Sequence, residues 1–285
     1  MDASSGFIIA ISVIVILAII LFNNKIAEDK IAPFDTTNPD LMESCAQEEL
    51  DWLKEDLAAA RETGDQQEES RLLSKLGSIH LQLGQYEEAI AFYQQAMDID
   101  WETGNRPGQS TNLGSLGLAH TSLGQHQEAL EYYLQQLDVT RQLRDLKGEG
   151  ATLHHLAGSY TALDQHEDAI EQLLLALNIF RITGNREAEI NTINSLTNAF
   201  TLLGQHQKAM EYCQLAMENA IADNDRMTEV ETEWQIGLLY EKLDDLDEAI
   251  YHMQTLVNFY REICHEDAKA RNEYLDKVKE KARWK

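Results

Sequence analysis

Hydrophobic residues recur with a period of 40 over most of the chain, and inside each period they follow the spacing of two helices. In the first half of the first period, Leu76 is followed by Gly77 and then, four residues after the leucine, by His80. In the second half, Ala89 precedes Tyr93 by four residues. Each half therefore predicts a helix with one apolar face, and the small residues mark places where two helices cross closely.

A short polar motif separates the two helices of each period. Residues 84–90, Gly-Gln-Tyr-Glu-Glu-Ala-Ile, return with changes at 124–130, 164–170, 204–210 and 244–250. Five copies at a constant spacing indicate stacked units of secondary structure rather than one globular core. The five predicted repeats are residues 64–103, 104–143, 144–183, 184–223 and 224–263.

Within one repeat, the large, small and aromatic positions resemble those of the tetratricopeptide repeat. The matching residues of the first copy are Leu73, Leu76, Gly77, His80, Gly84, Ala89, Tyr93 and Ala96. The proline that commonly closes this repeat is replaced, in the five copies, by Trp101, Arg141, Arg181, Ile221 and Arg261. The resemblance implies an all-α fold, a right-handed α-solenoid of helix pairs.

The period is longer than the commonest length of this repeat, which is about 34 residues. The extra residues lengthen the helices into a Gly-Asp or Gly-Asn turn, such as Gly64-Asp65 and Gly104-Asn105. This long form is similar to the repeats of kinesin light chain and of the receptor-independent G-protein regulators.

The segments on either side of the repeats are predicted to cover the ends of the stack. Residues 39–63 align with the second helix of the first repeat and predict a half repeat, with Asn38-Pro39 at its start. Residues 264–285 predict a capping helix with an apolar stripe formed by Ala270, Tyr274, Val278 and Ala282. A basic tail that binds a membrane or a partner is the alternative for this last segment.

An uncharged apolar run at residues 6–22 would reach about 25 Å as a helix. The sequence therefore predicts a tail at 1–5, a transmembrane helix at 6–22 and a linker at 23–38. A cleaved signal peptide is the alternative, but no basic residue precedes the run and no small-x-small site follows it. Lys25 and Lys30 follow the span, which predicts a single-pass protein with its repeats on the cytoplasmic or stromal side.

Charge and residue spacing exclude several classes of function. The net charge of -26 argues against a nucleic-acid partner. The histidines His126, His166 and His206 share one register, but repeats are separated by two helix layers of about 8 to 10 Å each, whereas zinc ligands lie about 2 Å from their ion. We therefore predict no metal site, no cofactor and, because no catalytic motif is found, no enzymatic activity.

The layout of one N-terminal span followed by such repeats is similar to that of the photosystem I assembly proteins of cyanobacteria and plastids. This resemblance implies a membrane-anchored scaffold that binds a protein partner, a subunit or assembly intermediate of a membrane complex, with the thylakoid as a candidate membrane. The alternative is a soluble-type regulatory or peptide-sensing module in signalling.

The partner site is predicted on the side of each first helix that the core does not use, which lines the concave wall in this fold. None of the chosen residues is charged, and charge depletion is typical of an interface core. They are Gly114, Leu118, Thr121, His154, Gly158, Thr161, Asn194, Asn198 and Thr201. Two alternatives remain: tight helix packing excludes charged side chains there, or the chain's own C-terminal helix fills the groove.

Overall fold

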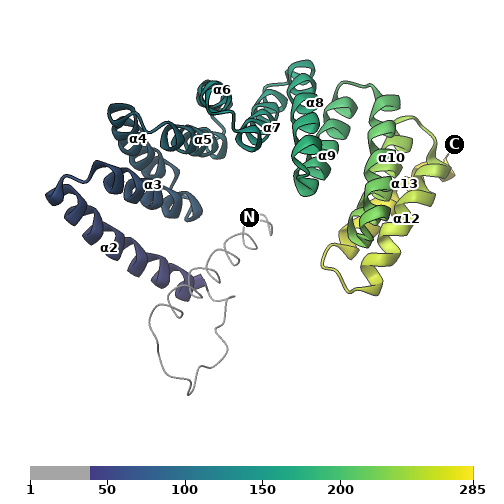
Figure 1. Cartoon of the computed structure of the whole chain (residues 1–285). Helices are drawn as coiled ribbons and strands as arrows, with labels where there is room; N and C mark the ends of the chain where they lie inside the picture. Colours follow the sequence, from purple (N-terminus) through teal and green to yellow (C-terminus); the bar gives the residue numbers. More distant parts are fainter. Residues whose placement is uncertain (1–38, 285) are drawn as a thin grey trace. The chain divides into compact units, whose positions relative to one another are not determined.

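The computed structural model describes residues 39–284, which divide into two compact units, one ending at Gly124 and one beginning at Gln125 (Figure 1). The first unit contains α2 (Pro39–Thr63), α3 (Gln66–Gln82), α4 (Tyr86–Thr103) and α5 (Arg106–Ser122). The second contains α6 (His126–Leu143), α7 (Leu146–Ala162), α8 (His166–Thr183), α9 (Arg186–Leu202), α10 (His206–Asp223), α11 (Arg226–Lys242), α12 (Leu246–Glu262) and α13 (Ala268–Arg283). The twelve elements of this part of the chain are all α-helices with no strand among them, which confirms the predicted all-α class.

The predicted tail, transmembrane helix and linker lie outside the described residues. Of the helices between residues 39 and 284, none is both long enough and apolar enough to cross a membrane.

Residues in the left-handed backbone conformation recur every 20 positions from residue 64 to residue 264 and end successive helices. Several are glycines, which adopt this conformation without strain; Gly64 has a φ of 70°. The others are Arg144, Asp164, Asn224, Asp244 and Cys264. Because these turns are evenly spaced, α3 to α12 are all 17 or 18 residues long.

The first helix of each repeat begins at an Asp or Asn that caps its free backbone N–H groups. Asp65 Oδ1 accepts a hydrogen bond from the backbone N–H of Glu68 at 3.1 Å, and Asn105 Oδ1 accepts one from Gly108 at 3.3 Å. The same contact is made by Asp145, Asn185 and Asp225. Such a cap contributes about 1 kcal/mol, so the sequence defines where each first helix starts.

Paired helices cross where a small residue meets a large one. A Cβ atom on Gly77 would lie 2.8 Å from Cε1 of Tyr93, and one on Gly237 would lie 2.7 Å from Cγ of Met253. The alanines that recur in the second helices are fully buried: Ala89, Ala129, Ala169, Ala209 and Ala249. The predicted close crossings are therefore confirmed in the repeats formed by α3 with α4 and by α11 with α12.

The last helix, α13, packs Leu275 and Val278 into the core around Trp234. The predicted apolar stripe of this helix is partly wrong, because Ala270 and Tyr274 are exposed and Leu275 was missed. A strict four-residue spacing drifts around a helix of about 3.6 residues per turn, so a buried stripe needs alternating steps of three and four.

Candidate functional site

The nine residues predicted for the partner site lie on first helices, three on α5 in the first unit and six on α7 and α9 in the second. The exposed members are Leu118, Gly158 and Asn198. The half-buried members are Gly114, His154 and Asn194. Three hydroxyl groups donate to the carbonyl four residues earlier, at 2.8, 2.8 and 2.7 Å: those of Thr121, Thr161 and Thr201. Their role in binding stays a prediction.

Half-buried side chains on the first helices form contacts between neighbouring repeats. His154 Nδ1 on α7 lies 3.1 Å from Thr192 Oγ1 on α9. In the first unit, Ser74 Oγ on α3 donates to Asn112 Oδ1 on α5 at 2.7 Å, across the same step of 38 residues. One row of the predicted wall therefore holds adjacent first helices together.

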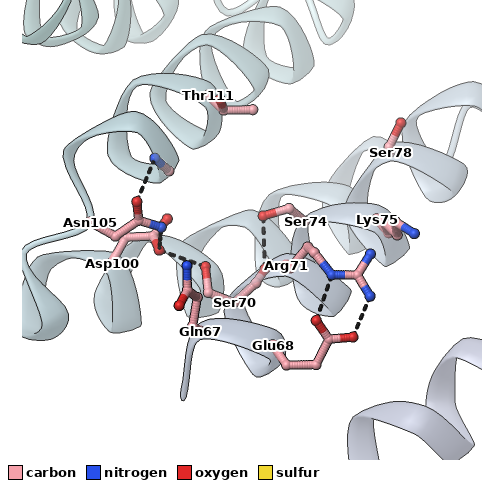
Figure 2. Close-up of a pocket in the computed structure, with 11 residues that line it drawn as sticks. Gln67, Glu68, Ser70, Arg71, Ser74, Lys75, Ser78, Asp100, Asn105 and Thr111 are labelled. Atoms are coloured by element: carbon pink, nitrogen blue, oxygen red, sulfur yellow. Dashed lines mark hydrogen bonds and ion pairs between the residues drawn. The ribbon is translucent and has the colours of Figure 1, made fainter. Parts of the chain in front are cut away.

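The first unit contains a pocket of about 480 Å³ between α3 and α5 (Figure 2). Three hydroxyl groups from successive turns of α3 line one side: Ser70, Ser74 and Ser78. The end of α4 and the start of α5 contribute Asp100, Asn105, Gly108 and Thr111. The residues that line the pocket are therefore mostly polar or charged, while their carbon atoms supply most of its exposed surface.

A buried carboxylate, Asp100, lies beneath this pocket with only 1% of its surface exposed. Its Oδ1 accepts hydrogen bonds from Ser70 Oγ at 2.7 Å and Asn105 Nδ2 at 2.8 Å, and its Oδ2 accepts one from Asn112 Nδ2 at 2.8 Å. All three donors are neutral, and within residues 39–284 Asp100 forms no ion pair with a Lys, Arg or His. Its carboxylate is held by neutral donors, with no cationic side chain paired to it.

The charges around the pocket rim balance one another. Arg71 donates to both carboxylate oxygens of Glu68, with 2.6 Å between Nε and Oε2 (Figure 2). The hydrogen bond from Arg71 lowers the pKa of Glu68. Lys75 lies near Glu49. Burial raises the pKa of Glu49, and the positive charge of Lys75 partly opposes that rise. The lining therefore holds two acidic and two basic residues, and Asp100 is the deeply buried one among them.

The junction beside the pocket departs from a recurring ion pair. At three other junctions an Arg near the end of one helix pairs with a Glu on the next first helix, at 2.7 to 3.0 Å: Arg61–Glu69, Arg141–Glu149 and Arg181–Glu189. Between α4 and α5 these two positions hold Trp101 and Gln109. The guanidinium of Arg106 lies 5.6 Å from the Trp101 ring centre, and Gln109 Nε2 donates to the Asp100 carbonyl at 2.8 Å. A buried polar network thus takes the place of the ion pair.

In the second unit, the wall formed by α7 carries two neighbouring imidazoles. The ring of His155 stacks on Tyr133 with centres 5.4 Å apart, and it meets His154 edge-on at 6.4 Å. Burial lowers the pKa of His154, and burial together with the nearby His154 lowers that of His155. Both rings are therefore neutral near pH 7 and offer uncharged hydrogen-bonding groups.

Sequence reasoning missed the pocket above Asp100, although one signal was present. At the corresponding position the other second helices and α2 hold Ala60, Thr140, Phe180, Ala220 and Tyr260. A carboxylate in a series of buried positions is unusual. Its three donors come from different helices and turns, and the 40-residue pattern does not reveal them. As for metals, the described residues contain no group of three His, Cys, Asp or Glu side chains that could hold an ion.

Comparisons with known proteins agree with the helix-pair architecture. Tetratricopeptide repeat profiles match residues 68–142, 148–222 and 231–262. A kinesin light chain protein of Podosopora anserina with nearly identical TPR-like repeats is 22% identical, with a TM-score of 0.61 over 69% of this chain and 98% of that one. Aspartyl phosphate phosphatase F of Bacillus subtilis is 16% identical, with a TM-score of 0.59 over 82% and 68% of the two chains.

A third solved structure is a Rap protein complexed with competence and sporulation factor. It is 17% identical, with a TM-score of 0.55, and the match covers 85% of this chain and 72% of that chain. At such identities the likeness concerns the fold alone. No curated protein matches the chain.

Proposed function

Because the chain belongs to the tetratricopeptide repeat family, we propose that it is a scaffold that binds a segment of a partner protein along its first helices. The observation that carries this proposal is the polar pocket between α3 and α5. Its hydroxyl groups and the amide of Asn105 line a concave site, and such groups suit recognition of a polypeptide segment. The exposed Asn198 and the half-buried His154 extend similar chemistry to first helices of the second unit.

The finer proposal is that this scaffold is anchored in a membrane by residues 6–22 and assists the assembly of a membrane complex, photosystem I being the named candidate. Its support is the uncharged apolar run and the two lysines that follow it. The exposed Cys264 tests the orientation. A membrane-impermeant thiol reagent should miss it in intact cells and label it after lysis, and labelling in intact cells would contradict the orientation.

The alternative is a soluble-type module that senses a peptide in signalling. It is favoured by the fold shared with the Rap protein that was solved together with competence and sporulation factor. The two proposals differ in the partner they recover. Crosslinked capture from solubilised native membranes should yield subunits of one membrane complex if the scaffold proposal holds, and a soluble signalling protein or peptide if the alternative holds.

The binding face can be tested with one pair of substitutions and a matched control. Gly158 is exposed with open space around its Cβ position, and Thr161 is half-buried, so Gly158→Arg with Thr161→Glu should fold and abolish capture. The control is Glu171→Arg, which places a charge on the exposed face of α8 and should leave capture unchanged. Capture at wild-type affinity by the double variant, with unchanged melting, would place the site elsewhere.

A further inference from the structure

We infer that the pocket above Asp100 receives a positively charged group, the guanidinium or ammonium of an Arg or Lys side chain in the bound segment. This inference rests on the proposed function and adds the chemistry of the partner. It concerns the first unit alone. Four observations carry it: a buried carboxylate without an ion pair, the end of a helix, lining cations that lie near other carboxylates, and one acceptor position left on Asp100.

The first observation is a contrast between two buried carboxylates. Glu189 has 9% of its surface exposed and pairs with both Arg181 and Arg186, each at 3.0 Å. Asp100 is more deeply buried, and its carboxylate accepts hydrogen bonds from the neutral side chains of Ser70, Asn105 and Asn112. A buried charge without a counter-charge is costly, and a cation from a ligand would relieve that cost.

The second observation is the position of Asp100 in the last turn of α4. The free carbonyl groups at a helix C-terminus carry partial negative charge, so a cation is favoured there and an anion is not. The last turn of α4 contains no basic residue. The position that holds Arg141 or Arg181 in other repeats is Trp101 here. The helix end therefore favours a cation near Asp100.

The third observation concerns the two cations that also line the pocket. Arg71 is engaged by Glu68 through two hydrogen bonds, and Lys75 interacts with Glu49. Figure 2 shows the Arg71–Glu68 pair and, apart from it, the hydrogen bond between Ser70 and Asp100. Each of the two cations therefore has a carboxylate other than Asp100 nearby, and neither forms an ion pair with Asp100.

The fourth observation is that Asp100 borders the pocket and keeps one acceptor position, with the backbone of Gly108 packed against its carboxylate. Gly108 lines the pocket, and a Cβ atom there would lie 2.3 Å from Asp100 Oδ2. Any larger residue would therefore press on the carboxylate. The three hydrogen bonds to Asp100 occupy three of roughly four acceptor positions of a carboxylate, so one remains for a donor from a ligand.

The test uses the full chain and two libraries of random nonapeptides, one with Arg fixed at each position in turn and one with citrulline in its place. Citrulline has nearly the shape of Arg and no charge. We expect peptides with Arg at one position to be captured about tenfold more than their citrulline counterparts, as for one partly buried ion pair. Equal capture at every position would overturn the inference while leaving the proposed function intact.

Two variants locate the effect. Asp100→Asn should remove the preference for Arg, and Asp98→Asn, a matched change at an exposed residue of the same helix, should keep it. Because Asp100→Asn disturbs a buried network, Thr111→Lys provides a second variant. Thr111 is an exposed residue of the pocket wall, so a lysine there should fold normally and supply the missing cation from the protein itself. An undiminished Arg preference in folded Thr111→Lys would contradict the site.

Failure of the proposed function is seen separately. If neither library is captured, the chain does not bind such segments, and the pocket is then tested with argininamide against citrullinamide. Argininamide alone should raise the melting temperature of the wild-type chain and not that of Thr111→Lys, since a ligand stabilises the folded state that binds it. Equal effects of the two compounds on the wild-type chain would overturn the inference.

Discussion

The junction between α4 and α5 and the junction between α8 and α9 share one backbone geometry and differ in chemistry. In both, a glycine in the left-handed conformation, Gly104 or Gly184, precedes an asparagine that caps the next helix. The buried position before the turn is Asp100 in one and Phe180 in the other.

Outside that position, the α8–α9 junction carries the Arg181–Glu189 ion pair, and the α4–α5 junction carries Trp101 and Gln109. The turns define the path of the chain. The buried position before each turn can hold either an apolar side chain or a polar one whose hydrogen bonds are all made. An apolar filler needs only the right volume, whereas a carboxylate needs its donors in place. The polar junction borders the pocket between α3 and α5.

The largest effect is expected when the buried carboxylate of the α4–α5 junction is placed in the α8–α9 junction without its hydrogen-bond donors. Phe180→Asp removes a buried aromatic side chain and leaves an unpaired carboxylate, so the free energy of unfolding should fall by about 5 kcal/mol or more. Urea unfolding measures this loss. The control Phe180→Leu should cost much less, because an apolar residue of similar volume repacks. Similar losses for the two variants would contradict the conclusion that this position requires an apolar side chain.

Removing the carboxylate from the polar junction should cost somewhat less. Asp100→Ala leaves the side-chain donors of Ser70, Asn105 and Asn112 without their acceptor, and we expect a loss of about 3 kcal/mol in urea unfolding. Thr140→Ala is the control at the equivalent position, where the hydroxyl donates only to the carbonyl of Leu137. If both variants lose the same free energy of unfolding, the hydrogen bonds to Asp100 add no stability beyond that of packing.

Placing a glutamine, as in the α4–α5 junction, at the equivalent position of the α8–α9 junction should have a moderate effect. Glu189→Gln weakens hydrogen bonds from Arg181 and Arg186, and we expect a loss of about 1 to 2 kcal/mol because the carboxylate is buried. In the more exposed pair, Glu149→Gln should cost less than 1 kcal/mol. Salt should reduce the second effect more than the first.

The turn itself offers a stabilising change. Arg144 adopts a φ of 56° where Gly104 stands in the polar junction. A side chain in the left-handed region costs about 1 kcal/mol, so Arg144→Gly should raise the free energy of unfolding by up to that amount. Thermal unfolding measures the gain. Gly104→Arg is the reverse change and should lower stability, and a gain from both would show that charge rather than backbone strain decides.

The smallest effect concerns two contacts between neighbouring first helices, one contact within each unit. The His154–Thr192 contact titrates, whereas Ser74–Asn112 does not. Because burial holds the pKa of His154 below its unfolded value of about 6.5, the unfolded state takes up protons first. Stability is therefore complete above pH 6.5 and falls as the pH drops toward the folded pKa. Melting followed from pH 7 to pH 5 should show this slope, and His154→Gln should reduce it, with the lowered pKa of His155 accounting for the part that remains.

Much of the fold follows from the sequence alone, because its determinants are local and repeat. The 40-residue period, the two helices of each repeat and the capping residues such as Asp65 can all be read along the chain. The crossings at Gly77 and Gly237 were expected from small residues beside large ones, and α2 begins at the expected proline, Pro39. These features depend on neighbours within about one helical turn, so periodicity and turn chemistry are sufficient.

The tertiary structure alone decided which polar residues meet. The donors to Asp100 lie 30, 5 and 12 residues away, on α3, in the turn and on α5, and their convergence depends on how each helix is rotated about its axis. For the same reason the sequence did not reveal that Leu275 is buried, that His154 is half-buried, or that the Thr161 hydroxyl donates a hydrogen bond within its own helix. One residue changes a side chain's direction by about 100°, so a repeat pattern predicts a helix face more reliably than the contacts made across it.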